Sequence, residues 1–390
     1  MSYTKQPLSS EFFVRSNEFL FDQGISDIEI NVQDWSGTKC FFPTSEKSAL
    51  PYDIFAASFY LLSRYEEYLP HVKDEYGRYA ATESLAYNSG FLHQPVVDIW
   101  AYRLKTALKE RFTDFEYPER EYSIEPIVDV PMAYLFKQKG LMRTFGGTLK
   151  DLARFRIRRL SQRFLVLFGF QNDPYDSFKW IINKQKKSNY RFAVFFLIGE
   201  YSTYDKNINV NRKSFVSLIK SISDYCKVGL KVSYFALDDI SLMKKERKKL
   251  ESITNFEIDS TRNSFSKTNL PTSYRNLVDL EINNDFTMGY RKHLGFRAGT
   301  CTPFLFYDLD YEVQTPLLIH SFHCLDHALL QYQSHLDRSE ALQRLIAEVK
   351  KVNGTFTAVF HNYVFGSELK WKGFRKLYSQ VLDSAKQIKV

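Results

Sequence analysis

Six polar side chains follow short apolar runs of the sequence, at the places where β-strands would end. They are Asp129, Asp285, Arg297, Asp326, His361 and Asn362. A carboxylate can hold a metal ion or orient an imidazole, an arginine stabilises anions, and a histidine transfers protons. If separate strands bring these groups to one edge of a sheet, they form a set suited to a hydrolase. Taken singly, each could equally be a loop cap or one half of a buried ion pair, and that alternative stays open.

The elements that would position these residues lie beyond residue 120, where short apolar runs alternate with longer helical or loop segments. The expected strands are 123–130, 192–198, 228–232, 256–258, 277–282, 293–297, 317–322 and 356–361. Strands that alternate with helices indicate a mostly parallel sheet covered by helices. Seven or eight such units favour a β/α barrel, in which polar residues at the carboxyl ends of the strands line the active site.

The N-terminal residues 1–120 have a different pattern, which predicts a smaller α+β domain ahead of a barrel domain over 121–390. Alternating apolar and polar residues predict a half-buried strand at 28–32. Apolar residues at helical spacing after Pro51 and after Pro95 predict helices over about 51–70 and 96–111.

A basic segment separates the two parts and is expected as a helical insertion at about 141–164. It carries seven basic residues against the single acid Asp151: Arg143, Lys150, Arg154, Arg156, Arg158, Arg159 and Arg163. Interleaved leucine and phenylalanine residues make an amphipathic basic helix. Such a helix can contact anionic membrane lipid or a phosphorylated glycan carrier, or it can be a solvated face packed over the barrel.

Composition and charge exclude several classes of protein. The chain has 53 basic and 45 acidic residues, a net charge of +8 that is too small and too local to indicate nucleic-acid binding. Its four cysteines form no CxxC pair, which excludes a zinc ribbon or a redox centre of that kind. No apolar segment suits a secretory signal or a membrane span, so we expect a cytoplasmic protein, with peripheral contact at the inner membrane as an option.

Three N-terminal motifs and their order resemble one bacterial family. Ser-Arg-Tyr-Glu-Glu-Tyr stands at 63–68, Asp-x-x-Gly-Arg at 74–78 and Pro-Val-Val-Asp at 95–98. These motifs, followed by the strand-end residues above, resemble the polysaccharide deacetylases (NodB-homology carbohydrate esterases), in a branch that carries an N-terminal domain of unknown function. The resemblance runs from about residue 20 to Tyr378 and implies an irregular (β/α)7 barrel that acts on N-acetylated sugars.

The resemblance also implies a divalent metal ion held by one Asp and two His, with a second Asp as general base. The metal-binding Asp corresponds to Asp129, but the general-base position is Ile127, and the two His positions are Lys231 and Ser264. One carboxylate cannot hold such an ion alone. The ammonium group of Lys231 could pair with Asp129 instead. The resemblance therefore implies no cofactor, or zinc, cobalt or nickel only at a rebuilt site.

The later motifs of the family are kept. The resemblance implies catalytic roles for His361, Arg297 and Asp326, and substrate-binding roles for Asp285, Asn362, Trp371 and Tyr290. A displaced metal site could use the close-spaced His320, His323, Asp326 and His327. A metal-free Ser-His-Asp arrangement could use Ser264 or Ser233 with His361, although the sequence has no Gly-x-Ser-x-Gly elbow to support it.

These residues leave three hypotheses about function. The first is a pseudoenzyme of bacterial surface-glycan metabolism that binds a glycan or a glycan-assembly protein and has lost, or strongly altered, metal-dependent deacetylation. The second is an active carbohydrate esterase or N-deacetylase with a displaced metal or none. The third is a scaffold or membrane-surface adaptor that works through the N-terminal domain and the basic residues from Arg143 to Arg163.

Overall fold

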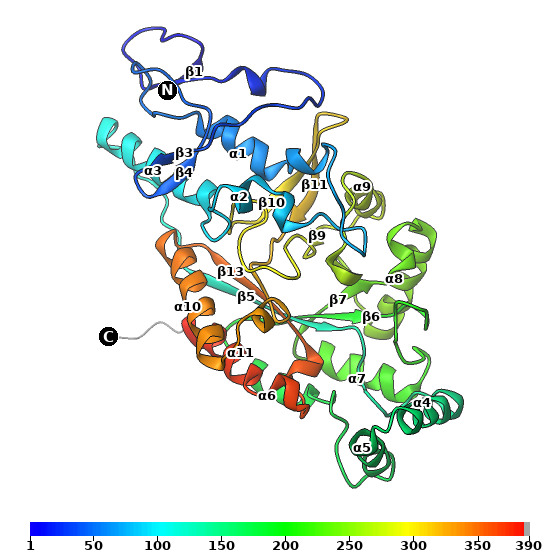
Figure 1. The fold of residues 1–390 in the computed structure, drawn as a ribbon. Coiled ribbons are helices and arrows are strands. Elements are labelled where there is room, and N and C mark those ends of the chain that lie inside the picture. Colours follow the sequence, from blue (N-terminus) through cyan, green and yellow to red (C-terminus); the bar gives the residue numbers. More distant parts are fainter. Residues whose placement is uncertain (386–390) are drawn as a thin grey trace. The chain divides into compact units, whose positions relative to one another are not determined.

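The computed structural model describes residues 1–385 (Figure 1). These residues form two compact units. The first unit contains residues 1–124 and 265–358, with the described residues from Ser384 on. The second unit contains residues 125–264 and 359–383. The two units are interleaved along the chain and are not the same as the domains expected at 1–120 and 121–390, so that division stays a prediction.

A mostly parallel sheet with covering helices forms the second unit. The strand order is β8-β7-β6-β5-β13, and the pairs β5–β6, β6–β7 and β7–β8 are parallel. The strands are β5 (Ser123–Val130), β6 (Ala193–Leu197), β7 (Lys227–Val232), β8 (Ser260–Asn263) and β13 (Thr355–His361), and the second unit contains residues 125–130 of β5 and 359–361 of β13. All residues of β6 are buried, as expected for a parallel strand that is covered on both faces. The chain is thus of the mixed α/β class, while a closed seven-unit barrel stays a prediction.

Six α-helices accompany this sheet among the described residues. They are α4 (Leu141–Ala153), α5 (Ile157–Leu167), α6 (Phe178–Gln185), α7 (Lys213–Ser223), α8 (Ile240–Thr254) and α11 (Phe374–Ser384). The basic segment predicted as one helix is therefore two helices, α4 and α5. The break lies at 154–156, where Phe155 has a left-handed backbone with φ of 50°. The segment is basic and amphipathic, as expected, but it folds as a helical hairpin.

The first unit contains the N-terminal elements and the segment 265–358. Its strands are β1 (Ser2–Thr4), β2 (Phe13–Arg15), β3 (Gln33–Trp35), β4 (Thr38–Cys40), β9 (Asn284–Asp285), β10 (Phe304–Asp308), β11 (Val313–Ile319) and β12 (Cys324–Leu325). Its α-helices are α1 (Ile54–Leu62), α2 (Leu85–Asn88), α3 (Val96–Arg111), α9 (Thr272–Asp279) and α10 (His335–Lys351). Strand β11 pairs antiparallel with β10 and parallel with β9.

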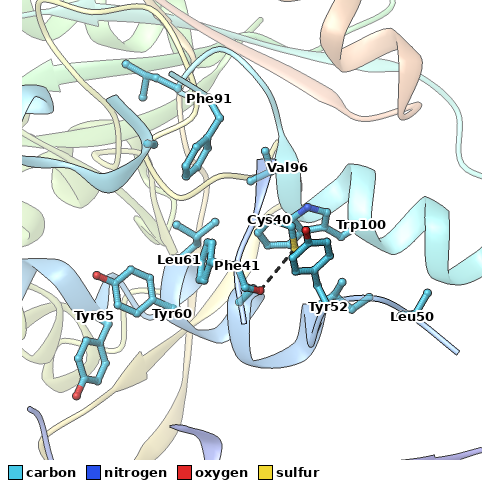
Figure 2. Packing of buried hydrophobic residues seen from close by; sticks show 14 of the residues in the cluster. Cys40, Phe41, Leu50, Tyr52, Tyr60, Leu61, Tyr65, Phe91, Val96 and Trp100 are labelled. Atoms are coloured by element: carbon cyan, nitrogen blue, oxygen red, sulfur yellow. Dashed lines mark hydrogen bonds between the residues drawn. The ribbon is translucent and has the colours of Figure 1, made fainter. Parts of the chain in front are cut away.

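An aromatic core holds the N-terminal elements of the first unit together (Figure 2). The ring of Phe41 lies edge-on to both Tyr60 and Trp100, each at 5.8 Å between ring centroids. Helix α1 begins at Ile54, and the carboxylate of the preceding Asp53 caps it by accepting hydrogen bonds from Phe55 N and Ala56 N. Helix α3 matches the bounds predicted from its apolar spacing after Pro95.

Four expected strands need correction. The strand expected at 256–258 lies a few residues later, at β8. The segment 277–282 begins inside helix α9, because Tyr274 and Leu277 lie one turn apart and form its buried face. Residues 293–297 and 28–32 form no strand. In the second of these segments, Ile28, Ile30 and Val32 alternate because they pack on the aromatic core as irregular chain.

Candidate functional site

A buried ionic cluster lies at the carboxyl ends of neighbouring strands in the second unit. Asp129 comes from β5, Lys231 from β7, Arg262 from β8, and His361 ends β13. Lys231 Nζ lies 2.8 Å, Arg262 Nε 3.1 Å and His361 Nε2 3.6 Å from Asp129 Oδ2. All four side chains are at most 6 % exposed. The ion pair between Lys231 and Asp129 that the sequence suggested is present, and Arg262 is a second partner that the sequence analysis did not assign.

Local packing allows the strands to bring these groups together. Gly229 in β7 is directly opposite Phe195 in β6. A Cβ atom at Gly229 would lie only 2.4 Å from the Phe195 ring, so a larger residue would displace that ring. In the next layer Lys231 is directly opposite Arg262 in β8. The register of β6, β7 and β8 therefore places both cations beside Asp129.

The electrostatics of the cluster favour an ionised aspartate. Burial by itself would raise the pKa of Asp129, but the charges of Lys231 and Arg262, with His361, lower it to about 2. Burial lowers the pKa of Lys231, and the neighbouring Asp129 carboxylate opposes that change. The Asp129 carboxylate is thus stabilised as an anion by the Lys231 ammonium and the Arg262 guanidinium, both within hydrogen-bond distance.

These residues do not fit a catalytic divalent ion. A metal held by Asp129 would lie beside the ammonium of Lys231 and the guanidinium of Arg262, which are donors only and repel a cation. The position of the expected general base is Ile127, a fully buried hydrocarbon side chain in β5. Asp129 Oδ1 accepts no hydrogen bond from the described residues and is the one open acceptor of this carboxylate. That oxygen suits a hydroxyl or a water molecule better than an ion next to two positive charges.

Two further buried acids lie near the ends of the same strands, and the sequence analysis missed both. Asp205 accepts hydrogen bonds from Tyr234 N at 2.7 Å and from Ser264 Oγ at 3.4 Å. Glu246 accepts one from Ser233 N at 3.1 Å. Burial raises the pKa of both carboxyl groups, that of Glu246 to about 7. At neutral pH Glu246 is therefore divided between its protonated and ionised forms, which is a property of general acids and bases.

A sequence signal for Glu246 exists in the spacing of its neighbours. It stands within the charged run Lys-Lys-Glu-Arg-Lys-Lys, which reads as a solvated face. However, Met243, Glu246, Leu250 and Ile253 follow one another at three- and four-residue spacing and are all buried on α8. The glutamate therefore occupies an apolar stripe of the helix, and that position predicts burial.

The serines of the proposed Ser-His-Asp arrangement have other neighbours. Ser264 Oγ contacts Asp205, and Ser233 lies against Glu246. His361 faces Asp129, and its ring stacks on Tyr363 at 4.8 Å between centroids. The structure thus places these hydroxyls beside carboxylates, so their role as nucleophiles paired with His361 stays a prediction.

Asn362 and Trp371 are buried close to His361 in the chain. Asn362 Nδ2 donates to the carbonyl oxygens of Met132 and Tyr175, both at 3.1 Å. Trp371 is 4 % exposed and contacts Tyr363 at 5.5 Å between ring centroids. Asn362 therefore connects two loops through its side-chain hydrogen bonds. The ring of Tyr363 stacks on His361 and contacts Trp371 at a tilt of 44°. Their roles in substrate binding stay predictions.

In the first unit, Arg297 takes part in a buried salt-bridge network. Its Nε and Nη2 lie 2.8 and 2.5 Å from the two carboxylate oxygens of Glu67. Glu67 Oε1 also accepts from Arg64 Nε at 2.7 Å. Arg64 and Glu67 belong to the Ser-Arg-Tyr-Glu-Glu-Tyr motif, so that motif provides the carboxylate that binds Arg297. A catalytic role for this arginine stays a prediction, and its guanidinium group is already bound by a carboxylate.

Tyr290 and Arg297 also line a pocket of about 200 Å³ in this unit, together with Asp74 and Arg78. The guanidinium carbon of Arg297 lies 5.4 Å from the centre of the Tyr290 ring. Burial raises the pKa of Tyr290 to about 12, so its hydroxyl stays protonated at neutral pH. The Asp-x-x-Gly-Arg loop and these two residues thus border the same space.

Other predicted residues of the first unit have structural neighbours. Asp285 accepts hydrogen bonds from Thr287 N and Oγ1 at 2.9 and 2.6 Å. Asp326 Oδ1 lies 2.6 Å from His327 Nδ1. His320 instead stacks on Phe286, and His323 lies against Phe296 and Phe356 in an apolar setting that lowers its pKa to about 3. Of the four residues of the displaced metal site, Asp326 and His327 come together, while His320 and His323 have other contacts.

Comparison with known proteins gives a partial match. Residues 1–113 match a family of unknown function, DUF7033. Among solved structures, a candidate polysaccharide deacetylase from Mycobacterium smegmatis is 12 % identical, covering 70 % of this chain and 87 % of its own, with a TM-score of 0.44. A mutant CE4-family pseudoenzyme with restored enzymatic activity is 10 % identical, covering 67 % of this chain and 63 % of its own, with a TM-score of 0.34. No curated relative matches the sequence.

Proposed function

We propose that this chain is a deacetylase-like protein that binds a glycan, or a protein of glycan assembly, and does not hydrolyse amides by the metal-dependent route. The observation that carries the proposal is the contact of Lys231 Nζ and Arg262 Nε with Asp129 Oδ2, at 2.8 and 3.1 Å. Two fixed cations take the place that the mechanism reserves for a metal ion. The aspartate is thereby converted from a ligand into the centre of a salt-bridge cluster.

Loss of the general base supports the same conclusion. Metal-dependent hydrolysis needs a group that takes a proton from the attacking water. Ile127 has no atom that can do so, and it is completely buried. Replacement of the base, of one His by Lys231 and of the other by Ser264 removes three separate requirements of the reaction.

The glycan class of the ligand rests on the motifs that resemble the deacetylases, with a role in bacterial surface-glycan metabolism as the wider setting. Two features of the second unit are compatible with a sugar. Asp129 Oδ1, a buried acceptor that receives no hydrogen bond from the described residues, would pair with a sugar hydroxyl once neighbouring side chains move aside. Tyr363, which contacts His361 and Trp371, is half-buried, and its exposed part offers an aromatic face of the kind on which sugars pack.

The test compares binding and turnover on the same ligand. N-acetylated oligosaccharides such as tetra-N-acetylchitotetraose are titrated into the protein by calorimetry, and acetate release is followed in parallel. We expect heat of binding with no acetate above the protein-free blank. His361→Ala is the matched variant, because His361 would be the general acid of an active enzyme. Acetate release that disappears in His361→Ala would instead establish an active esterase.

A further inference from the structure

The basic hairpin of α4 and α5 combines two features that are unusual together. Its two helices pack on each other and lie beyond α7 at the edge of the second unit (Figure 1). One side carries large apolar side chains exposed to solvent, and the other lines a cationic pocket of about 560 Å³. Neither feature has a part in the buried cluster around Asp129, so the role of this hairpin is independent of the proposed function.

Both helices of the hairpin expose large apolar side chains. On α4, Leu141, Phe145, Leu149 and Leu152 follow one another at three- and four-residue spacing, and all are exposed. Leu141 is 90 % exposed, and Phe155, at the tip between the helices, is 86 % exposed. Six further large apolar side chains are exposed on α5 and just after it: Ile157, Phe164, Leu165, Leu167, Phe168 and Phe170. Water-soluble monomers rarely expose so many large apolar residues in one segment unless the surface binds something.

The opposite side of α4 faces the pocket. Arg143, Gly147 and Lys150 follow one another at the same helical spacing and line it. In all, eight lysine or arginine side chains line the pocket, and Asp151 is the one carboxylate among its lining residues. The two glycines of α4, Gly146 and Gly147, weaken the helix. A Cβ atom at Gly147 would lie 2.7 Å from Arg163 Nη1, so this glycine leaves room for the arginine.

The charges in the pocket are only partly balanced. Asp151 pairs with Arg163 and lies 3.7 Å from Arg159 Nε. Arg154 and Arg156 are exposed, and among residues 1–385 no carboxylate lies within ion-pair distance of either. Lys139 lies deeper, and burial, with the neighbouring arginines, lowers its pKa to about 8 against the opposing effect of Asp173. Cations that crowd around one carboxylate repel each other, and a multivalent anion would relieve that repulsion.

We propose that the α4–α5 hairpin docks on an anionic membrane surface, with its apolar side among the acyl chains and a phosphate headgroup in the cationic pocket. The geometry fits a helix pair that lies in the interface, with phenylalanine and leucine on one side and basic residues on the other. Helices of 13 and 11 residues are too short to span a bilayer. None of the helices in the described part of the chain is long and apolar enough to cross a membrane.

An anionic membrane accounts for both the exposed apolar residues and the cationic pocket of the hairpin, whereas each other kind of partner accounts for only one of them. A second copy of the chain could cover the apolar residues but would bring its own basic pocket close to the first. A free phosphate could fill the pocket but would leave the apolar residues in water. Charge complementarity and the apolar surface together therefore select anionic lipid.

The test uses the full chain and sedimentation with vesicles of phosphatidylcholine alone or with phosphatidylglycerol. We expect binding to the vesicles that contain phosphatidylglycerol and little to the others. Arg154→Glu with Arg156→Glu should weaken that binding by roughly 30-fold or more, since each basic residue near the surface adds attraction. Leu141→Ser with Phe155→Ser should reduce it as well. Both pairs are exposed, so the variants should fold, which circular dichroism checks.

Matched controls make the same changes elsewhere on the surface. Lys244→Glu with Lys248→Glu alters two exposed lysines of α8, and Phe256→Ser with Leu336→Ser removes two exposed apolar side chains. These variants should bind the vesicles like the original chain. The proposal is overturned if the hairpin variants bind the vesicles as well as the original chain does, or if the original chain binds neither kind of vesicle. Dimerisation that Phe155→Ser abolishes would then identify a second copy, and pyrophosphate binding alone a free anion.

Discussion

Replacing Asp129 by asparagine is expected to lower the free energy of unfolding by about 3 to 5 kcal/mol. Asparagine has nearly the same shape, so the substitution leaves the packing of β5 intact. It removes the negative charge on which Lys231 Nζ and Arg262 Nε depend, at 2.8 and 3.1 Å. Two buried cations would then face each other without a counter-ion. Urea unfolding of the original chain and the variant, followed by circular dichroism, measures the loss.

Two further variants show whether the loss is electrostatic. Lys231→Met in the Asp129→Asn background removes one of the uncompensated cations and should restore part of the stability. Asp224→Asn changes an exposed carboxylate of the same unit and should alter the free energy of unfolding by less than about 0.5 kcal/mol. If Asp129→Asn changed the free energy of unfolding no more than Asp224→Asn does, the ionic cluster would not stabilise the fold.

The same ion pairs give a dependence on pH. The pKa of Asp129 in the folded protein is about 2, below its ordinary value of 3.8. A lowered carboxyl pKa stabilises the fold above the unfolded value and loses that effect as the pH falls through the folded value. The contribution, about 2 kcal/mol, should therefore be complete above pH 5 and disappear between about pH 4 and pH 2. Asp129→Asn should lack this part of the acid destabilisation.

The second large effect is expected in the first unit, from Glu67→Gln. The Glu67 carboxylate is fully buried and binds Arg64 Nε at 2.7 Å and Arg297 Nε and Nη2 at 2.8 and 2.5 Å. Burial would raise its pKa, but Arg297 and Arg64 lower it to about 2. Neutral glutamine would leave the buried Arg297 without its counter-ion, while Arg64 would keep Glu66, whose Oε1 lies 2.6 Å from Arg64 Nη2. We expect a loss of about 3 to 5 kcal/mol in the free energy of unfolding.

Thermal and urea unfolding measure this effect, with Glu29→Gln as the control on an exposed glutamate. The control should behave like the original chain. A change below about 1 kcal/mol in Glu67→Gln would mean that water reaches the network and that its salt bridges resemble surface pairs.

The sequence was a good guide where local pattern decides the structure. Helix α3 and strands β5, β6, β7 and β13 lie close to the predicted segments, because apolar spacing and flanking prolines are local features. It was a poor guide at 277–282, where Leu277 and its neighbours fit a strand by composition but a helix by spacing to Tyr274. At 28–32 an irregular segment packs one side on the core. Its apolar and polar residues therefore alternate as they would in a strand, although the segment pairs with no strand among the described residues.

The candidate site shows the same limit. The pair of Lys231 and Asp129 could be predicted, because a motif placed both residues near one centre. The partner of Arg297 could not, since Glu67 stands 230 residues earlier in the chain. The local sequence around an arginine at a predicted strand end is the same whether the arginine binds a substrate or neutralises a carboxylate that is distant in the chain. That choice depends on tertiary contacts that no local pattern encodes.

The most direct test of the central claim is the metal content of the purified protein. The chain is incubated with zinc, cobalt and nickel, desalted, and analysed by elemental mass spectrometry beside Asp129→Ala. We predict no metal above background in the original chain, because Lys231 and Arg262 neutralise Asp129. Near-stoichiometric metal that Asp129→Ala removes would contradict the account and would establish a rebuilt metal site at this carboxylate.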